Sequence, residues 1–214
     1  MKILCVSDQI DPVVYSASIK EHFRDVDLIL SAGDLPMDYL DFIVSSLNKP
    51  LLFVSGNHDR PDHEGGPPGR NGPAPPGAGL IHVGARVKRE EGLIIAGLGG
   101  SMRYNRGGNQ YTNFEMTLMI GKLIPALLLN RIFRGRFLDI LLTHAAPEGI
   151  HDLKDLCHRG FRPFLWFMRV FKPRYLIHGH IHLYDIQTVR VTRYRETTVL
   201  NAYGHYLIDT GAAP

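Results

Sequence analysis

The sequence contains only two cysteines, Cys5 and Cys157, among 214 residues. Two cysteines are too few for a disulfide framework, and they do not have zinc-finger spacing, so we expect reduced, structural thiols. The chain also lacks a strong charge of either sign, because 24 Lys and Arg residues accompany 21 Asp and Glu residues, giving a formal net charge of +3. This mild basicity favours an anionic partner. It makes nucleic acid a possible partner, but not the favoured one.

Long uninterrupted hydrophobic runs are also missing. Residues 1–10 contain one Lys and a short apolar segment broken by Asp8, which fits neither a signal peptide nor a membrane span. A later apolar segment, 113–133, is interrupted by polar residues and by Pro125 before it reaches the roughly 20 residues that a span requires. We therefore expect a cytoplasmic protein without a transmembrane segment.

The hydrophobic pattern predicts alternating strands and helices. With 44% hydrophobic residues, the chain is long enough for one well-cored domain, 1–214. The expected strands are 2–6, 27–31, 51–55, 79–83, 92–98, 137–143, 174–178, and antiparallel strands within 188–199 and 205–209. The expected helices are 16–24, 37–47, 113–133 and 161–171. The opening βαβαβ order predicts a parallel sheet with right-handed crossovers, and the last strands are expected to close a second sheet.

Two segments are expected to lie outside this core. Residues 61–79 are dominated by Pro and Gly and predict a mobile surface loop. Residues from about 99 to 136 predict a lid or substrate-side insertion, with 113–133 as a helix kinked at Pro125 that packs over the sheet. The alternative for this helix is a position on a membrane surface, with Arg131, Arg134 and Arg136 at the lipid headgroups.

Side chains that bind metals follow five of the apolar strands. The clusters are Asp8, Gly33-Asp34, Gly56-Asn57-His58-Asp59, Thr143-His144 and Gly179-His180-Ile181-His182. In an open α/β sheet, ligands bind in the crevice beyond the carboxyl ends of the strands, so all five clusters can converge there. Carboxylate, amide oxygen and imidazole together suit a divalent ion such as Mn, Fe or Zn at a catalytic site.

A two-metal hydrolase site follows from this ligand mixture. One carboxylate shared by two ions can hold them roughly 3.5–4 Å apart, the separation that stabilises both oxygens of a phosphoryl displacement. Asp34, on a turn that begins with glycine, is the natural bridge. A lone Gly-Asp or His is more often structural, but five such clusters in order after successive strands are not readily explained that way. Arg103 and Tyr104, in the glycine-rich stretch 99–111, are candidate substrate contacts.

These blocks resemble those of the calcineurin-like metallophosphoesterase superfamily: Asp-x-His, Gly-Asp, Gly-Asn-His-Asp/Glu, His, and Gly-His-x-His. Four of the five are intact, spread between Asp8 and His182. The resemblance implies an αββα sandwich of two mixed β-sheets flanked by helices. It further implies that Asp34 bridges two metals, with Asp8 and His182 on the first ion. It implies that the remaining metal ligands, Asn57, His144 and His180, bind the second ion.

The resemblance gives His58 a different role, that of contacting the phosphate and assisting the leaving group, held by Asp59. The departure from the family pattern lies in the first block, where Asp8-Gln9-Ile10 replaces Asp-x-His. Isoleucine cannot bind a metal, so the first site is weakened by one imidazole, unless Gln9, Asp11 or water completes it.

Two functions from different classes follow. The first is a metal-dependent phosphoesterase that hydrolyses a phosphodiester or phosphomonoester by attack of a metal-activated hydroxide at a dinuclear site, with manganese among the candidate metals. A diesterase is slightly favoured. The second is a degenerate metal-binding module that regulates or docks a partner with little turnover. Ile10 supports the second reading, whereas retention of His58 and Asp59 argues against it.

Overall fold

A computed structural model describes residues 1–59, 79–185 and 187–210. The expected loop 61–79 therefore lies outside the described residues except for Gly79. The helices of the described part are α1 (Ile19–His22), α2 (Met37–Leu47), α3 (Asn113–Arg134) and α4 (Arg162–Phe171). Its strands are β1 (Lys2–Ser7), β2 (Val26–Ser31), β3 (Leu51–Phe53), β4 (Leu80–His82), β5 (Arg86–Glu90), β6 (Leu93–Leu98), β7 (Ser101–Met102), β8 (Gln110–Tyr111), β9 (Ile140–Thr143), β10 (Tyr175–His178), β11 (Val191–Tyr194), β12 (Thr197–Asn201) and β13 (Gly204–Asp209).

The described strands form two large mixed sheets and one short pair. The first sheet has the order β13-β1-β2-β3-β4, and the second has the order β11-β12-β10-β9-β6-β5. The inner strands of both sheets are parallel to their neighbours, whereas β13, β11 and β5 are antiparallel additions at the edges. The carboxyl ends of the parallel strands therefore present several loops at one edge of each sheet.

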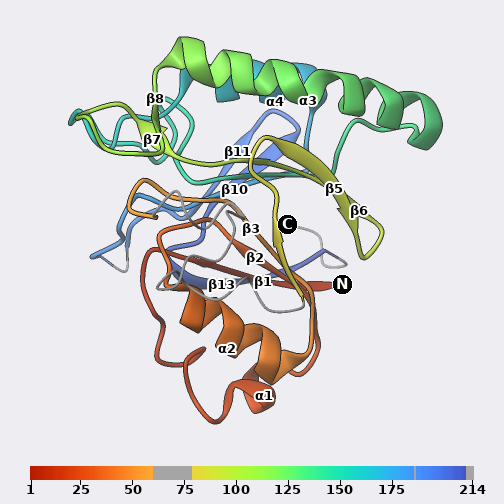
Figure 1. Cartoon of the computed structure of the whole chain (residues 1–214), viewed down its shortest axis with the longest axis vertical. Helices are drawn as coiled ribbons and strands as arrows, with labels where there is room; N and C mark the ends of the chain where they lie inside the picture. The colour runs from red at the N-terminus through yellow and green to blue at the C-terminus, as the bar shows by residue number, and fades with distance from the viewer. Residues whose placement is uncertain (60–78, 186, 211–214) are drawn as a thin grey trace, which may run out of the picture.

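The sheets pack face to face between two layers of helices, as Figure 1 shows, with α1 and α2 on the first sheet and α3 and α4 on the second. Alternation along β1 illustrates the layering, because Ile3 and Cys5 pack between the sheets while Leu4 and Val6 pack beneath α1 and α2. Each central strand is thus buried on both faces, which explains its continuous apolar sequence. The predicted αββα sandwich is confirmed.

Several elements differ from the sequence prediction. Helix α1 has only 4 residues rather than the expected 16–24. The hydroxyl of Ser16 bonds instead to the carbonyl of Val13 and to the hydroxyl of Ser18, in competition with helical hydrogen bonds. Strand β5 was not expected, because Arg86–Glu90 is a charged edge strand with little hydrophobic pattern. The last strand, β13, joins the first sheet beside β1 and not the second sheet.

Helix α3 begins and ends at clear sequence signals. Thr112 and Glu115 form a capping box, and Gly135 adopts a left-handed conformation (φ +72°) immediately after the last turn. The helix runs for 22 residues without interruption across Pro125, so the predicted helix over 113–133 is confirmed. By length and mean hydropathy (1.5) it is the one described helix that could cross a membrane, with 22% of the most apolar window buried.

Candidate metal centre

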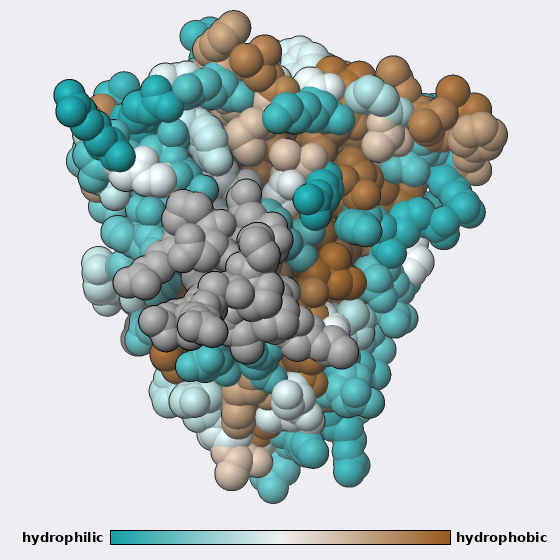
Figure 2. Space-filling model, viewed as in Figure 1, coloured by the Kyte–Doolittle hydropathy of each residue, from teal (hydrophilic) through white to brown (hydrophobic). Residues whose placement is uncertain are grey.

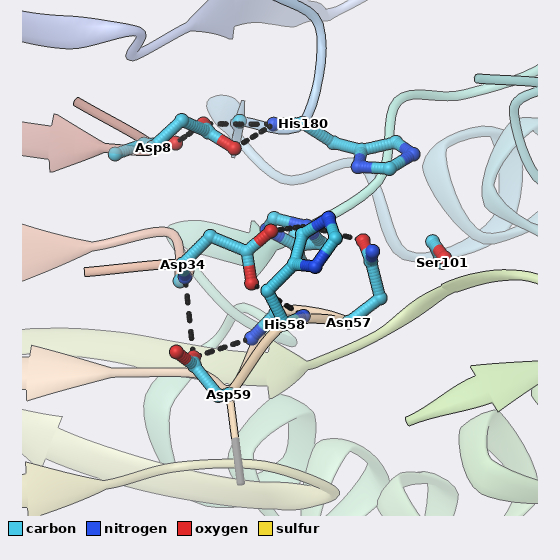
Figure 3. A network of polar contacts seen from close by, with 12 residues as sticks. Asp8, Asp34, Asn57, His58, Asp59, Ser101 and His180 are labelled. Carbon is cyan, nitrogen blue, oxygen red and sulfur yellow. Dashed lines mark hydrogen bonds and ion pairs between the residues drawn. The ribbon is translucent and has the colours of Figure 1, made fainter. Parts of the chain in front are cut away.

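The five predicted clusters meet beyond the carboxyl ends of strands from both sheets. Asp8, Asp34 and the 57–59 turn follow β1, β2 and β3 of the first sheet, while His144 and His180 follow β9 and β10 of the second. Figure 3 shows the side chains from the two sheets facing one another across the junction. Residues up to 172 positions apart in sequence therefore share one site, as the contact between Asp8 and His180 illustrates.

Three of these residues have strained backbones. Asp8, Asp34 and His180 adopt positive φ angles of 63°, 56° and 67°, a region that non-glycine residues rarely occupy. Each costs about 1–3 kcal/mol and persists only where the surroundings enforce it, and such residues cluster at functional sites. The three residues therefore mark the junction of the sheets as a candidate functional site.

Two glycines allow the loops to approach closely. A Cβ atom at Gly56 would collide with the carboxylate of Asp34, and one at Gly179 would collide with the side chains of Ser7 and Asp8. The Gly in the Gly-Asn-His-Asp and Gly-His-Ile-His motifs is therefore required by the space that the carboxylates occupy.

A nitrogen and two oxygens converge at the centre of the site. The Nδ1–H of fully buried His144 donates to the carbonyl of Ala32 (2.7 Å), because a carbonyl can only accept. The Nε2 atom of this ring then lies 3.0 Å from Oδ1 of Asn57 and 3.3 Å from Oδ2 of Asp34. A histidine whose outer nitrogen is fixed by a backbone carbonyl is the usual arrangement of a metal ligand.

His180 completes the group. Its Nε2–H donates to the carbonyl of Cys157 (2.8 Å), so Nδ1 carries the free lone pair of the neutral ring. Ligand atoms of Asp34, His144 and His180 all lie within 4.8 Å of one another. Asp8 approaches from the other side, where both of its carboxylate oxygens accept from the backbone N–H of His180 (3.0 and 2.9 Å).

The shifts in pKa of the buried side chains show that the carboxylates favour a positive charge at His144. Burial alone would lower the pKa of His144, but the carboxylates of Asp34 and Asp8 raise it above its usual value. Burial would conversely raise the pKa of Asp34, and the neighbouring His144 holds it below its usual value. Burial, with the charge of His144 nearby, lowers the pKa of His180 to about 4, so this ring stays neutral near pH 7.

These donors fit a divalent cation. The oxygens of Asp34 and Asn57 face the same imidazole nitrogen, and the carboxylates favour a positive charge there, which a bound ion would supply in place of a proton. Neutral His180 offers a second imidazole ligand. The donor set of carboxylate, amide oxygen and imidazole therefore suits a divalent ion at this position.

The first predicted metal site is more open. His182 is exposed, and its Nδ1 lies 2.8 Å from the hydroxyl of Tyr184. Ile10 is 42% exposed, and both carboxylate oxygens of Asp11 are already engaged, one by the ring of His205 (2.7 Å) and one by the N–H of Val13 (2.8 Å). Among the residues proposed to replace the missing histidine, Asp11 thus has other partners.

A cavity of about 290 Å³ opens onto the cluster. Its lining joins the predicted residues with one that the sequence interpretation missed, His158; the lining residues are Asp8, Asp34, His58, His158, His180 and His182. The ring of His158 lies 5.2 Å from that of His180 and hydrogen-bonds to Asp155 (2.8 Å). No hydrophobic strand precedes His158, so the pattern that revealed the other clusters could not reveal this one.

The structure gives Asp59 a different set of contacts from those we expected. Its Oδ2 accepts from the backbone N–H groups of Asp34 (3.1 Å) and Gly56 (2.7 Å), and not from the ring of His58. Figure 3 shows the side chains of His58 and Asp59 pointing away from each other. Asp59 therefore fixes the turn that carries Asp34. The exposed ring of His58 faces the cavity, and the backbone N–H of His58 donates to Oδ1 of Asp34 (2.8 Å).

The two predicted substrate residues occupy different places. The amide nitrogen of Asn57 donates to the hydroxyl of Tyr104 (3.3 Å), so Tyr104 reaches the cluster. Arg103 instead forms an ion pair with Glu115 (2.9 Å) and is not in the lining of the cavity. The loop around Tyr104 depends on Gln110, whose Oε1 accepts from the N–H of Tyr104 (3.1 Å), a role that the sequence did not indicate.

Asn109 is a second residue that sequence reasoning missed. Its side-chain amide donates to the backbone carbonyls of Gly56 (3.1 Å) and Asp59 (3.2 Å) and so ties the turn after β3 to the loop before β8. Asn109 itself has a positive φ of 50°. A single Asn in a glycine-rich stretch carries no periodic signal, which is why its position became evident only in three dimensions.

Comparisons with known proteins give a consistent family and fold. The family model described as calcineurin-like phosphoesterase matches residues 1–184. One solved crystal structure aligns with a TM-score of 0.67 at 13% identity, covering 98% of this chain and 95% of the other. The protein TT1561 of Thermus thermophilus aligns with a TM-score of 0.63 at 14% identity, covering 94% of this chain and 88% of its own. A search of curated proteins finds no match.

Proposed function

Because the chain belongs to the calcineurin-like phosphoesterase family, we propose that it hydrolyses phosphate esters with the help of divalent metal ions at the junction of its two sheets. The observation that carries the proposal is the convergence of Asp34, His144 and His180, with ligand atoms within 4.8 Å, beside a cavity that His58 also lines. A site for binding alone would not require an exposed histidine beside the bridging carboxylate.

The proposed metal ligands are divided between two positions. Asp34 would be shared by both ions, and Asp8 and His182 would hold the first. The second ion would be held by a fuller set, namely Asn57, His144 and His180. When bound, such ions would polarise phosphoryl oxygens and lower the pKa of coordinated water towards neutrality. This supplies a nucleophile without a covalent phosphoenzyme. Mn, Fe and Zn all suit the donor set.

The protein's own side chains would do the rest. His58 faces the cavity, where its ring can contact the phosphoryl group and give a proton to the departing oxygen. Asp59 acts as a positioning residue, since it holds the N–H groups of the Asp34 turn. The hydroxyl of Tyr104 holds the amide of Asn57, which fixes the direction in which the Asn57 carbonyl faces.

The substrate class is the finer part of the proposal. The cavity of about 290 Å³ is bordered by several histidines and accommodates a phosphate group with part of its ester substituent. We propose a phosphodiester, with a phosphomonoester as the alternative. The test is turnover of chromogenic phosphomonoesters and phosphodiesters by the metal-reconstituted protein. We expect a higher kcat/KM for the diester; a higher kcat/KM for the monoester would reassign the substrate class, and hydrolysis of neither would contradict the proposed activity.

Position 10 offers a test of the division between the two ions. The first position has fewer protein ligands, because Ile10 stands where the family pattern has histidine, so its occupancy should depend more steeply on added metal. We expect Ile10→His to increase turnover at limiting Mn and to shift the Mn titration of activity to lower concentration. Val13→His is the matched control, since Val13 is also 42% exposed on the same loop.

The outcome at position 10 also shows whether another group already completes the first metal position. If the titration curves of parent and Ile10→His superimpose, or if the variant is weaker, another group already completes the first position. His158 is the candidate for that role, because it lines the same cavity as Asp8. In a protein that carries His158→Ala, Ile10→His would then shift the Mn titration of activity to lower concentration, which it did not do in the parent.

A further inference from the structure

Helix α3 presents large apolar side chains to solvent along its outer face. The exposed fractions are 70% for Phe114, 55% for Leu118, 49% for Leu128, 54% for Leu129, 72% for Ile132 and 74% for Phe133. In Figure 2 apolar residues gather along the upper edge of the molecule, over α3, and are densest at the upper right, where α3 ends. Exposed apolar side chains that cluster in this way mark an interaction surface.

The outer apolar residues follow the helical repeat. Steps of three and four residues lead from Phe114 through Leu118, Gly121, Pro125 and Leu128 to Ile132, so the outer stripe extends along the whole helix. The opposite face of α3 is apolar too, but its residues are buried against the second sheet and α4; they are Met116, Ile120, Leu123 and Leu127. A helix that is apolar on two opposite faces needs a covering on both.

The charges beside the stripe are positive. Lys122, Arg131 and Arg134 are exposed on α3 itself, and the one acidic residue of this helix, Glu115, is occupied by Arg103 and the N-cap. Within the described part of the chain, Arg134 has no acidic partner. A broad apolar stripe edged by Arg and Lys matches the boundary between the acyl chains and the anionic headgroups of a bilayer.

Helix α4 extends this surface. Next to Phe114, a groove of about 440 Å³ between α3 and α4 is lined by Arg162, Arg169 and Trp166. Trp166 is 40% exposed, and both arginines are exposed. Tryptophan is enriched at the level of lipid headgroups, and arginine binds phosphate there.

We propose that the outer face of α3, with Trp166 and the arginines beside it, docks on the surface of a membrane that contains anionic lipids. Burial of Met116, Ile120, Leu123 and Leu127 in the core ties the inner face of α3 to the protein, so the helix lies along the bilayer surface and does not cross it. A second copy of the chain is the other occupant to consider, but it would bring a stripe edged by the same positive charges, whereas anionic lipids supply the opposite charge.

Vesicle co-sedimentation of the full chain tests the proposal, with phosphatidylcholine vesicles compared with vesicles that also contain phosphatidylserine. We expect sedimentation with the anionic vesicles that weakens as salt is raised. We expect the double variant Ile132→Glu, Phe133→Glu to lose at least about tenfold in vesicle affinity, because charge is moved into the apolar stripe. Val189→Glu, at a 62% exposed position outside α3, is the control and should bind as the parent does.

Trp166 provides an independent readout, because it is the single Trp in the chain. Its fluorescence should shift to shorter wavelength when anionic vesicles are added to the parent, and should stay unchanged in the double variant. Unaltered melting temperature and esterase turnover would show that the variants are folded. The proposal would be overturned by sedimentation with neither vesicle type, or by binding that the double variant retains. It would equally be overturned by a concentration-dependent dimer that the double variant abolishes, since the stripe would then be a contact between copies.

Discussion

Asp34→Asn is expected to lower turnover of a phosphate ester by several orders of magnitude, together with loss of bound metal. The substitution keeps the size of the side chain and can still accept the N–H of His58, but it removes the negative charge that faces His144. In the proposed site this charge lies between two cations, so its loss weakens both. Turnover and elemental analysis of the same purified sample measure the two effects together.

The control for this variant is Asp38→Asn, which removes an equal charge from an exposed position in the first turn of α2. We expect Asp38→Asn to retain parental turnover and metal content. Near-parental turnover and metal content in Asp34→Asn would contradict its assignment as the bridging ligand. The backbone of Asp34 has a positive φ that asparagine also tolerates, so we expect the variant to fold. Circular dichroism checks this separately.

His58→Ala should have a large effect of another kind. Proton transfer by a placed side chain contributes about 10²–10⁴-fold to a rate, so kcat should fall within that range. Metal content should stay at the parental level, since the ring of His58 is exposed in the cavity and is not among the clustered ligand groups. The loss should shrink for esters with very good leaving groups, which need no proton, and a leaving-group series in both proteins measures this.

His22→Ala is the control for His58→Ala, because His22 is an exposed histidine in α1, away from the cavity. It should leave both turnover and the leaving-group dependence unchanged. If His58→Ala lost metal in parallel with activity, His58 would be a ligand. If its effect were the same for every leaving group, the proton-transfer role would have to be abandoned.

The sequence predicted which side chains would converge because the strands that precede them are short, apolar and buried on both faces. Asp8, Asp34, Asn57, His144 and His180 each follow such a strand, and the carboxyl-end rule brings them together without knowledge of the pairing order. The αββα architecture came from the resemblance to a family and not from periodicity. Strand pairing shows why, because β13 lies beside β1 although these two strands come from opposite ends of the chain.

The remaining features depend on contacts that leave no periodic trace in a sequence. Asn109 and Gln110 support the site through bonds to backbone groups, and His158 enters the cavity from a loop. Arg103 was a reasonable candidate for phosphate binding, but Glu115 at the start of α3 pairs with it. Which partner an exposed arginine chooses is decided by small differences in energy, typically about 0.2–1 kcal/mol for an exposed pair, and a sequence does not encode them visibly.

The outer face of α3 illustrates a different limit. Its apolar residues are as hydrophobic as those of the inner face, so the sequence alone could not separate a buried lid from a helix with one exposed side. The structure separates them, because Met116 and Ile120 are buried whereas Ile132 and Phe133 are 72% and 74% exposed. The proposed membrane docking of the exposed face rests on this contrast.

Metal removal and re-addition test the central claim most directly. The parent protein is stripped with a chelator, its folded state is verified, and turnover of a chromogenic phosphodiester is followed while Mn is titrated back alongside elemental analysis. We predict that the stripped protein is folded and inactive, and that turnover returns as two equivalents of metal bind. One equivalent should bind tightly, at the second position, and the other should bind at higher Mn, at the first position. Full turnover by the stripped protein, or metal binding that restores none, would contradict a metal-dependent phosphoesterase.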